Sequence, residues 1–483
     1  MEVDFVKKRL LHGMAWLSVS KLIIQIASWV STILVARLLT PDDYGIVAIS
    51  GIFIGIMTII TDLGMTAGVI NADKLSDTQR DTVFWVNVLL GLATFTIAWT
   101  SAPFIAKYYQ LAELTDVIRT AALTLIITGI RVVPYAMTMR GLNFKRVSII
   151  ETIGQGVNIS VAISLAYAGF GYWAIVYSVI AYQLVATLLY SLYLGGLPKL
   201  QLHIASSKSI LTFGIKDLTS ASLFYIIDYA PTFIISTRLG QAVTGNYAMA
   251  YSLAQMPMEK IGAIFNQVIF PSFSRLKTEA GEARSLFINL HKYLLFITAP
   301  MLLGVAIVAD DLIILLLGEK WAGSGPILQL ICVLNLLRIS AMICAPAIKG
   351  MGRINSIIKY QILYALTLPV ALAIGVNWGA EGAIIAWIIL FPWVYSYVYF
   401  KLREILHFSF LELVKPLVPV FISSAIMTLG VLLVTDTASS MALHYRLALS
   451  ITAGALLYAL CYMTLFRREL SNNMTALKTL FGK

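Results

Sequence analysis

The sequence is poor in charged residues. Asp, Glu, Lys and Arg make up only 12% of its 483 residues, whereas 59% are hydrophobic. A soluble protein carries about twice that charged fraction. The alternation of apolar and polar residues in segments of about ten, which is typical of a membrane β-barrel, is also absent. Apolar runs recur from end to end instead, and they predict an all-α integral membrane protein that crosses the bilayer many times.

Residues for metal, redox and nucleotide chemistry are scarce. The three cysteines all lie in apolar segments, and no pair has the spacing of a metal site or a disulfide framework. The Walker A, His-Glu-x-x-His and dinucleotide-binding glycine motifs are missing. We therefore expect no enzyme activity, no metal and no cofactor. Energy for transport then has to come from an ion gradient, such as H⁺ or Na⁺, from the substrate gradient or from a partner.

The formal net charge of +11 has a simple explanation in a membrane protein. Lys and Arg concentrate in cytoplasmic loops, so their excess predicts no nucleic acid partner. Placing the N-terminus inside assigns most basic residues between the apolar segments to the cytoplasmic side. Both termini are then cytoplasmic, and the expected location is the cytoplasmic (inner) membrane, with many passes through the lipid bilayer.

Fourteen apolar segments are long enough to cross a hydrocarbon core of about 30 Å. The predicted spans are 13–36, 45–70, 82–103, 116–139, 147–169, 171–195, 211–237, 243–270, 286–309, 326–348, 353–376, 379–402, 413–435 and 445–466. After the ninth span, Asp310 and Asp311 interrupt the apolar run, and the apolar residues 312–317 are too few to cross.

The sequence also contains a weak internal repeat. Residues 13–38 align without gaps with 214–239, and a glycine follows each copy, at Gly45 and Gly245. Spans four and ten each end with a proline and a short basic loop. Both copies start inside, which predicts a parallel repeat of six spans followed by two more. The expected parts are 1–200 (spans one to six), 201–405 (spans seven to twelve) and 406–483. Transporters are commonly built from such repeats, with the substrate site between them.

Several charges fall inside predicted spans. Lys21 in span one and Asp62 in span two both lie about eight residues, or roughly 12 Å, from the inner ends. They could pair across the hairpin. A charge at membrane depth costs at least roughly 2.5–3.5 kcal/mol, so it usually faces a partner or a wet cavity. The same count places four more charges at roughly 12–17 Å. These are Arg131, Glu259, Lys260 and Arg338.

Four cations and two anions thus share one level of the membrane. A cavity with net positive charge attracts anions, and Lys and Arg hold phosphate oxygens. The candidates for an anionic headgroup are Lys21, Arg131, Lys260 and Arg338, with Asp62 and Glu259 as charge partners. Each could instead be half of a structural ion pair. Asp228, near the middle of span seven, could carry a proton or coordinate Na⁺, or be a hydrogen-bonded structural acid. The aromatic run from Trp387 to Tyr399 could stack on sugars, although interfacial belts and packing against lipid also explain it.

Six short segments resemble one family of transporters. They read VARLLTPDDYG (35–45), DLG (62–64), FWVN (84–87), FPSFSR (270–275), GEKW (318–321) and PILQL (326–330). Together they are similar to the polysaccharide transporters of the MOP superfamily, the Wzx-type flippases of lipid-linked oligosaccharides. The likeness is greatest to the branch that exports colanic-acid-like exopolysaccharide units.

The resemblance implies two six-helix lobes facing each other across a central lumen, with the last two helices outside. It implies alternating access, in which an undecaprenyl-diphosphate-linked oligosaccharide crosses from the inner to the outer leaflet for surface polysaccharide and lipopolysaccharide synthesis. A polysaccharide polymerase and export machinery are the implied protein partners. The resemblance makes Lys21 the first choice for contacting pyrophosphate, and it links Asp228 to Na⁺.

Two other classes stay open. A multidrug or organic-cation antiporter of the same superfamily should have a net acidic lumen, which the charge count disfavours. A membrane enzyme that uses polyprenyl substrates should have acidic catalytic loops. The acids of the predicted outer loops, whose spacing fits no such site, are Asp42, Asp43, Asp310, Asp311 and Glu319.

Overall fold

The computed structural model describes residues 24–72, 74–194, 198–277 and 279–467, apart from some side chains within 216–270. The chain divides into two compact units, Met1–Gly245 and Asn246–Lys483. Within the described residues every regular element is helical, as the composition predicted. Ten helical segments of this part are long and apolar enough to cross a membrane.

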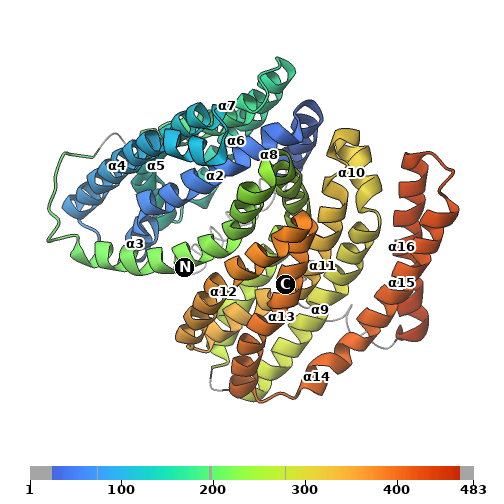
Figure 1. The fold of residues 1–483 in the computed structure, drawn as a ribbon. Coiled ribbons are helices and arrows are strands. Elements are labelled where there is room, and N and C mark those ends of the chain that lie inside the picture. The colour runs from blue at the N-terminus through green and yellow to red at the C-terminus, as the bar shows by residue number, and fades with distance from the viewer. Residues whose placement is uncertain (1–23, 73, 195–197, 278, 468–483) are drawn as a thin grey trace. The chain divides into compact units, whose positions relative to one another are not determined.

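The first unit begins with a helix over Ile24–Leu38. The helices that follow it are α2 (Pro41–Asp62), α3 (Met65–Asn71), α4 (Asp77–Tyr109), α5 (Glu113–Arg140), α6 (Phe144–Tyr167) and α7 (Trp173–Leu194) (Figure 1). The long segment α8 (Lys208–Arg275) contains the residues at which the two units are divided.

In its described part, the second unit continues after α8 with eight helices and three 3₁₀ turns. The helices are α9 (Ala280–Ile307), α10 (Ala309–Leu317), α11 (Ser324–Gly350), α12 (Ile354–Gly375), α13 (Gly379–Leu406), α14 (Phe410–Val414), α15 (Val418–Thr437) and α16 (Leu443–Leu465). The 3₁₀ turns η1 (Glu319–Trp321), η2 (Val376–Trp378) and η3 (Lys415–Leu417) lie between them. Helix α10 is the short apolar piece that the sequence marked as unable to cross.

Local sequence signals determine where α2 begins and ends. Thr40 caps its N-terminus in a capping box with Asp43, and Pro41 occupies the first helical position. The helix stops where Leu63 and Gly64 adopt left-handed φ angles of 47° and 64°. Predicted span two is therefore two helices, α2 and α3, with a break directly after Asp62.

Burial identifies the central helices of each unit. In α5 and α9, 56% of the most apolar stretch is buried, against 22% in α6 and 28% in α16. Small residues allow neighbouring helices to pack closely against these central helices. A Cβ on Gly129 of α5, for example, would lie only 2.6 Å from the carbonyl oxygen of Asn87 in α4. Apolar faces left exposed by α6 and α16 are what a helix presents to lipid.

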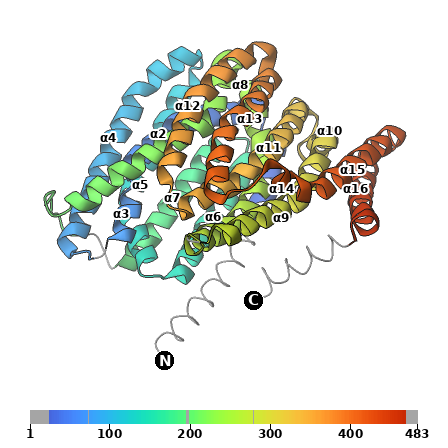
Figure 2. The same ribbon diagram turned by 90° about the horizontal axis from the view of Figure 1, so that it is seen from below.

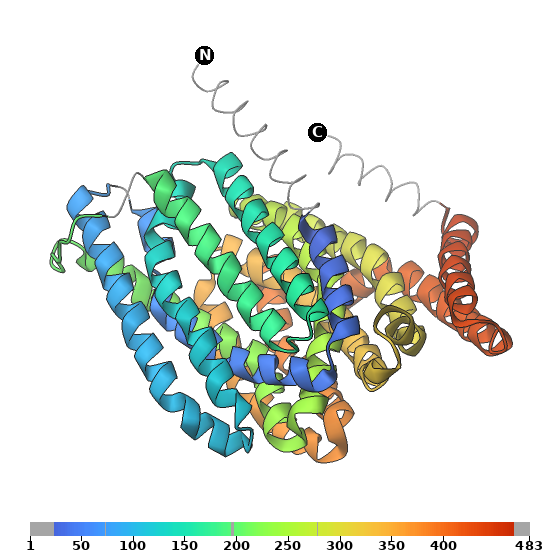
Figure 3. The same ribbon diagram turned by 90° about the horizontal axis from the view of Figure 1, so that it is seen from above.

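Helices α15 and α16 form a separate pair at the edge of the second unit. Figures 2 and 3 show them lying side by side. The guanidinium of Arg446 in α16 binds the carboxylate of Asp311 in α10, with a distance of 2.7 Å from Nε to Oδ2. A second bond, from Nη2, makes the pair bidentate. This ion pair joins the C-terminal helices to the rest of the unit.

Candidate functional site

The structure describes only some of the predicted site residues. Lys21 lies outside the described residues, and Lys260 lies in α8 with a side chain that is not described. Glu259, beside it, is exposed. The geometry therefore bears on the four remaining residues, which are Arg131, Arg338, Asp62 and Asp228.

Asp62 lies at the break between α2 and α3. Its Oδ1 accepts hydrogen bonds from the backbone N–H of Thr66 at 3.2 Å and from the Thr66 hydroxyl at 2.8 Å. The N–H groups in the first turn of a helix have no partner within the helix. Asp62 thus supplies a hydrogen-bond acceptor to the first turn of α3, just after Gly64. This role at the helix start is separate from its predicted pairing with Lys21.

Arg131 belongs to a polar network that joins three helices. Its guanidinium carbon lies 6.0 Å from the ring centroid of Tyr182, which comes from α7. The Tyr182 hydroxyl donates to Glu151 of α6 at 2.5 Å, and the Tyr190 hydroxyl donates to the other carboxylate oxygen at 2.9 Å. Gly154 leaves room for the Tyr182 ring, since a Cβ there would lie 3.0 Å from it. The network holds one cation and one anion.

Glu151 was missed by the sequence analysis. It lies inside predicted span five, but close enough to its inner end to pass as an interfacial charge. A signal was present, because a carboxylate in an apolar helix needs donors. Tyr182 and Tyr190, two turns apart on the next helix, supply them.

Arg338 lies in an aromatic environment in the second unit. Its guanidinium carbon is 4.9 Å from the ring centroid of Trp387 in α13, a cation–π distance. The Trp387 indole N–H donates to the Tyr364 hydroxyl of α12 at 2.6 Å. Trp387 is 0% exposed, whereas Trp393 is 77% exposed. The aromatic run therefore divides between core and surface, and its buried members cannot stack on a sugar in this conformation.

A second polar cluster lies on the same helix as Arg338. Ser340 Oγ is 2.9 Å from Nε2 of His291 in α9, and Cys344 Sγ is 3.0 Å from the Tyr395 hydroxyl of α13. His291 is buried. It lies in the interior of α9, among the buried residues of that helix. These contacts join α9, α11 and α13 around the Arg338 region.

Asp228 lies on the part of α8 that packs against α2. Its neighbours Tyr225 and Tyr229 stack with ring centroids 4.2 Å apart. The Tyr225 hydroxyl donates to the backbone carbonyl of Ile52, and its ring fills the space above Gly55, where a Cβ would lie 2.8 Å from a ring carbon. Asp228 is thus on a helix turn firmly docked on α2.

Two of the acids in the predicted outer loops have clear structural partners. Asp43 accepts from the Thr40 backbone N–H at 2.8 Å and from the Tyr172 N–H at 3.1 Å, so it joins the start of α2 to the α6–α7 turn. Asp311 is paired with Arg446. Across the described part of the chain no three His, Cys, Asp or Glu side chains gather as a metal site would require.

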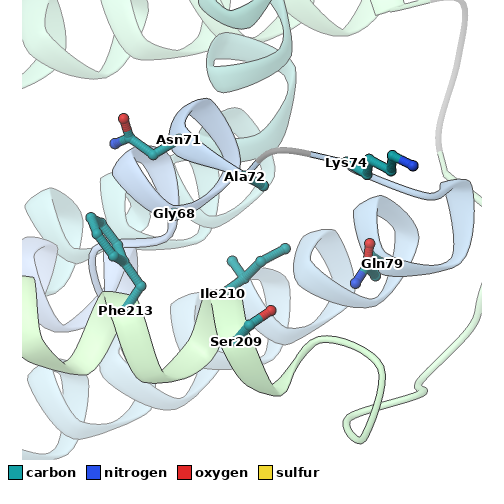
Figure 4. Close-up of a pocket in the computed structure, with 8 residues that line it drawn as sticks. All are labelled: Gly68, Asn71, Ala72, Lys74, Gln79, Ser209, Ile210 and Phe213. Atoms are coloured by element: carbon teal, nitrogen blue, oxygen red, sulfur yellow. The ribbon is translucent and has the colours of Figure 1, made fainter.

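A cleft of about 350 Å³ opens where α3 ends and α4 and α8 begin (Figure 4). Its lining is Gly68, Asn71, Ala72, Lys74, Gln79, Ser209, Ile210 and Phe213. Nearby, Arg140 donates to the carbonyl oxygen of Val69 at 3.0 Å and so caps the end of α3. The cleft contains none of the predicted headgroup residues, and its volume suits a small molecule rather than an oligosaccharide.

Comparisons with known proteins give a consistent family. The sequence profile described as "Polysaccharide biosynthesis protein" matches residues 34–326. The chain is 28% identical over 474 residues to the teichuronic acid biosynthesis protein TuaB of Bacillus subtilis (strain 168), covering 94% of this chain and 95% of TuaB. It is 24% identical over 381 residues to the lipopolysaccharide biosynthesis protein WzxC of Escherichia coli (strain K12), covering 77% and 76%. It is 22% identical over 405 residues to the succinoglycan biosynthesis transport protein ExoT of Rhizobium meliloti (strain 1021), covering 82% and 81%.

Solved structures show the fold. The lipid II flippase MurJ in an inward closed conformation matches with a TM-score of 0.74 and 13% identity, covering 94% of this chain and 99% of MurJ. An inward-facing multidrug resistance transporter of the MATE family and MOP superfamily matches with a TM-score of 0.63 and 16% identity, covering 82% and 99%. The chain therefore has the fold shared by these transporters.

Proposed function

Since the chain belongs to the family of polysaccharide biosynthesis proteins, we propose that it is a flippase for a lipid-linked oligosaccharide. The substrate is a polyprenyl-diphosphate-linked repeat unit, which moves from the inner to the outer leaflet of the cytoplasmic membrane by alternating access. The observation that carries the proposal is the family match over residues 34–326. The relatives named for teichuronic acid, lipopolysaccharide and succinoglycan synthesis support a polysaccharide precursor as cargo.

The proposed topology has fourteen crossings with both termini in the cytoplasm. It counts α8 as two crossings and α12 and α13 as one each, and it counts the helix ending at Leu38 as the first. Lys145, in the first turn of α6, and Arg353, directly before α12, then lie at the inner surface, where basic residues are favoured. Residues 1–200 and 201–405 form the two lobes of this proposal, and 406–483 the C-terminal pair.

The headgroup site of the proposal uses the intramembrane cations. Arg338 offers a guanidinium over an aromatic ring, with tyrosine hydroxyls close by, a set that can hold phosphate and sugar oxygens. Lys21 and Lys260 add positive charge. Arg131 contributes within a network that already contains the carboxylate of Glu151. Asp228 is the proposed ion-coupling residue, and a polysaccharide polymerase is the proposed partner.

The proposal is tested by complementing a strain that lacks the gene. Arg338→Ala should lower surface polysaccharide at least about tenfold and accumulate lipid-linked units inside, since losing one charge-assisted phosphate contact costs roughly 1.5–3 kcal/mol. Lys359→Ala, which removes an exposed cation of α12, is the matched control and should leave the output unchanged. Lys21→Ala should behave as Arg338→Ala does.

Two results would count against the proposal. Full polysaccharide output from both Lys21→Ala and Arg338→Ala, at normal protein levels, would rule out the proposed headgroup site. Normal polysaccharide in the deletion strain, together with new sensitivity to cationic drugs, would favour the antiporter instead.

A further inference from the structure

The start of α2 and the kink of α8 meet within the first unit through two glycines. A Cβ added to Gly45 would lie 2.0 Å from the carbonyl oxygen of Gln241. A Cβ added to Gly245 would lie 1.8 Å from the carbonyl oxygen of Pro41. Both obstacles are backbone atoms, which cannot rotate away as a side chain can. Glycine is therefore required on both sides of this contact.

The two contacts are reciprocal. Each glycine stands four residues after the carbonyl group that the other glycine touches, Gly45 after Pro41 and Gly245 after Gln241. Gly45 and Gly245 are also the glycines that follow the two copies of the internal repeat. Equivalent turns of the two repeats thus touch through the same atoms on both sides, as in a contact with two-fold symmetry.

The two sides of this contact differ in what holds them. On the α2 side, the carboxylate of Asp43 binds the backbone N–H groups of Thr40 and Tyr172, which fixes the turn to the α6–α7 connection. On the α8 side, Gly240 has φ 80° and ψ −177°, a conformation essentially restricted to glycine. One turn is anchored, and the other follows a residue that can act as a hinge.

We propose that the Gly45–Gly245 contact is a latch that closes the transport path at this end of the molecule and opens by bending at Gly240. The proposal rests on the proposed function, because alternating access requires each end to open. In the proposed topology both turns are on the outer side. Contacts between Cα–H groups and carbonyl oxygens are individually weak, so the latch can open without breaking a strong bond.

The latch is tested by the accessibility of a residue beneath it. Thr244 is 0% exposed, and its hydroxyl donates to the Gly240 carbonyl at 2.7 Å. Thr244→Cys is the reporter, labelled with a membrane-impermeant maleimide in right-side-out vesicles. The three natural cysteines, all buried, are first replaced by alanine; they are Cys332, Cys344 and Cys461.

Gly45→Ala and Gly245→Ala, made separately, should each raise the labelling rate at least about tenfold, since forcing a methyl group into packed backbone strongly disfavours the closed state. The matched control is Gly51→Ala in the same helix α2, where an added Cβ meets nothing within 4 Å. It should label at the parent rate. Parent-rate labelling of both folded latch variants, or an equal rise in the control, would overturn the latch.

A variant that adds no side-chain volume keeps the test valid if the glycine variants misfold. Asp43→Asn weakens the anchor on the α2 side and should raise the labelling rate, though less than the glycine substitutions do. If the glycine variants do not purify as folded protein, parent-rate labelling of Asp43→Asn overturns the proposal. Labelling needs no substrate, so a failed latch and a failed flippase assignment give different results.

Discussion

At the scale of the residue, charge inside the helices is accompanied by aromatic and hydroxyl groups. Arg131 contacts Tyr182, whose hydroxyl binds Glu151, and Arg338 lies over Trp387. Counting positions along each span identified Arg131 and Arg338 as intramembrane charges. It could not identify Glu151 or Trp387 as their neighbours, because these come from other helices and only packing brings them together. The headgroup role of the cations remains a prediction.

The Glu151 network makes a stability prediction. Tyr190→Phe should cost roughly 1–3 kcal/mol, because it removes one hydrogen bond to a charged group. Glu151→Ala should cost more, because it leaves two hydroxyls, those of the half-buried Tyr182 and the buried Tyr190, without their acceptor. The double variant should be less destabilised than the sum of the two, by at least about 0.5 kcal/mol. Unfolding of the purified protein in detergent measures all three, and strict additivity would show that Tyr190 and Glu151 do not act together.

At the scale of the element, apolar length predicted most helices well. Predicted spans three to six correspond to α4 to α7, and 326–348 corresponds to α11. The break between α2 and α3 was not predicted, because Leu63 is an ordinary apolar residue by composition and only its backbone angle ends the helix. Predicted spans 211–237 and 243–270 correspond to the two parts of α8, which are divided at Gly240, where the backbone is not helical (φ 80°, ψ −177°).

The attachment of the C-terminal helix pair makes a prediction at this scale. Asp311 and Arg446 are 15% and 24% exposed, so their ion pair is largely shielded from water. Asp311→Ala should lower the melting temperature clearly, because breaking a buried pair costs roughly 3–5 kcal/mol, less where water reaches it.

The control for this ion pair is Glu404→Ala, which breaks the exposed pair with Lys401 in α13 and should change the melting temperature little. The double variant Asp311→Ala, Arg446→Ala should be no less stable than the worse single variant. A further drop in melting temperature in the double variant would mean that the two residues stabilise the protein independently.

At the scale of the whole molecule, the motifs along the sequence predicted a polysaccharide transporter, and the family match over residues 34–326 confirms that family. The predicted all-α membrane fold is confirmed as well, with the fold of MurJ and of MATE transporters. One of these motifs has a local structural role, because Thr40 and Asp43 form the capping box of α2. The identity of the sugar has no comparable local signature, so the repeat unit that this chain moves is not encoded in any motif we identified.

The most direct test of the central claim is flipping by the purified protein in liposomes. A fluorescent undecaprenyl-diphosphate oligosaccharide is placed in both leaflets, and a membrane-impermeant quencher reports how fast the protected half becomes accessible. The account predicts rapid loss of the protected fluorescence with the natural protein and a rate at least about tenfold lower with Arg338→Ala. A rate equal to that of protein-free liposomes, from protein that is folded and inserted, would contradict it.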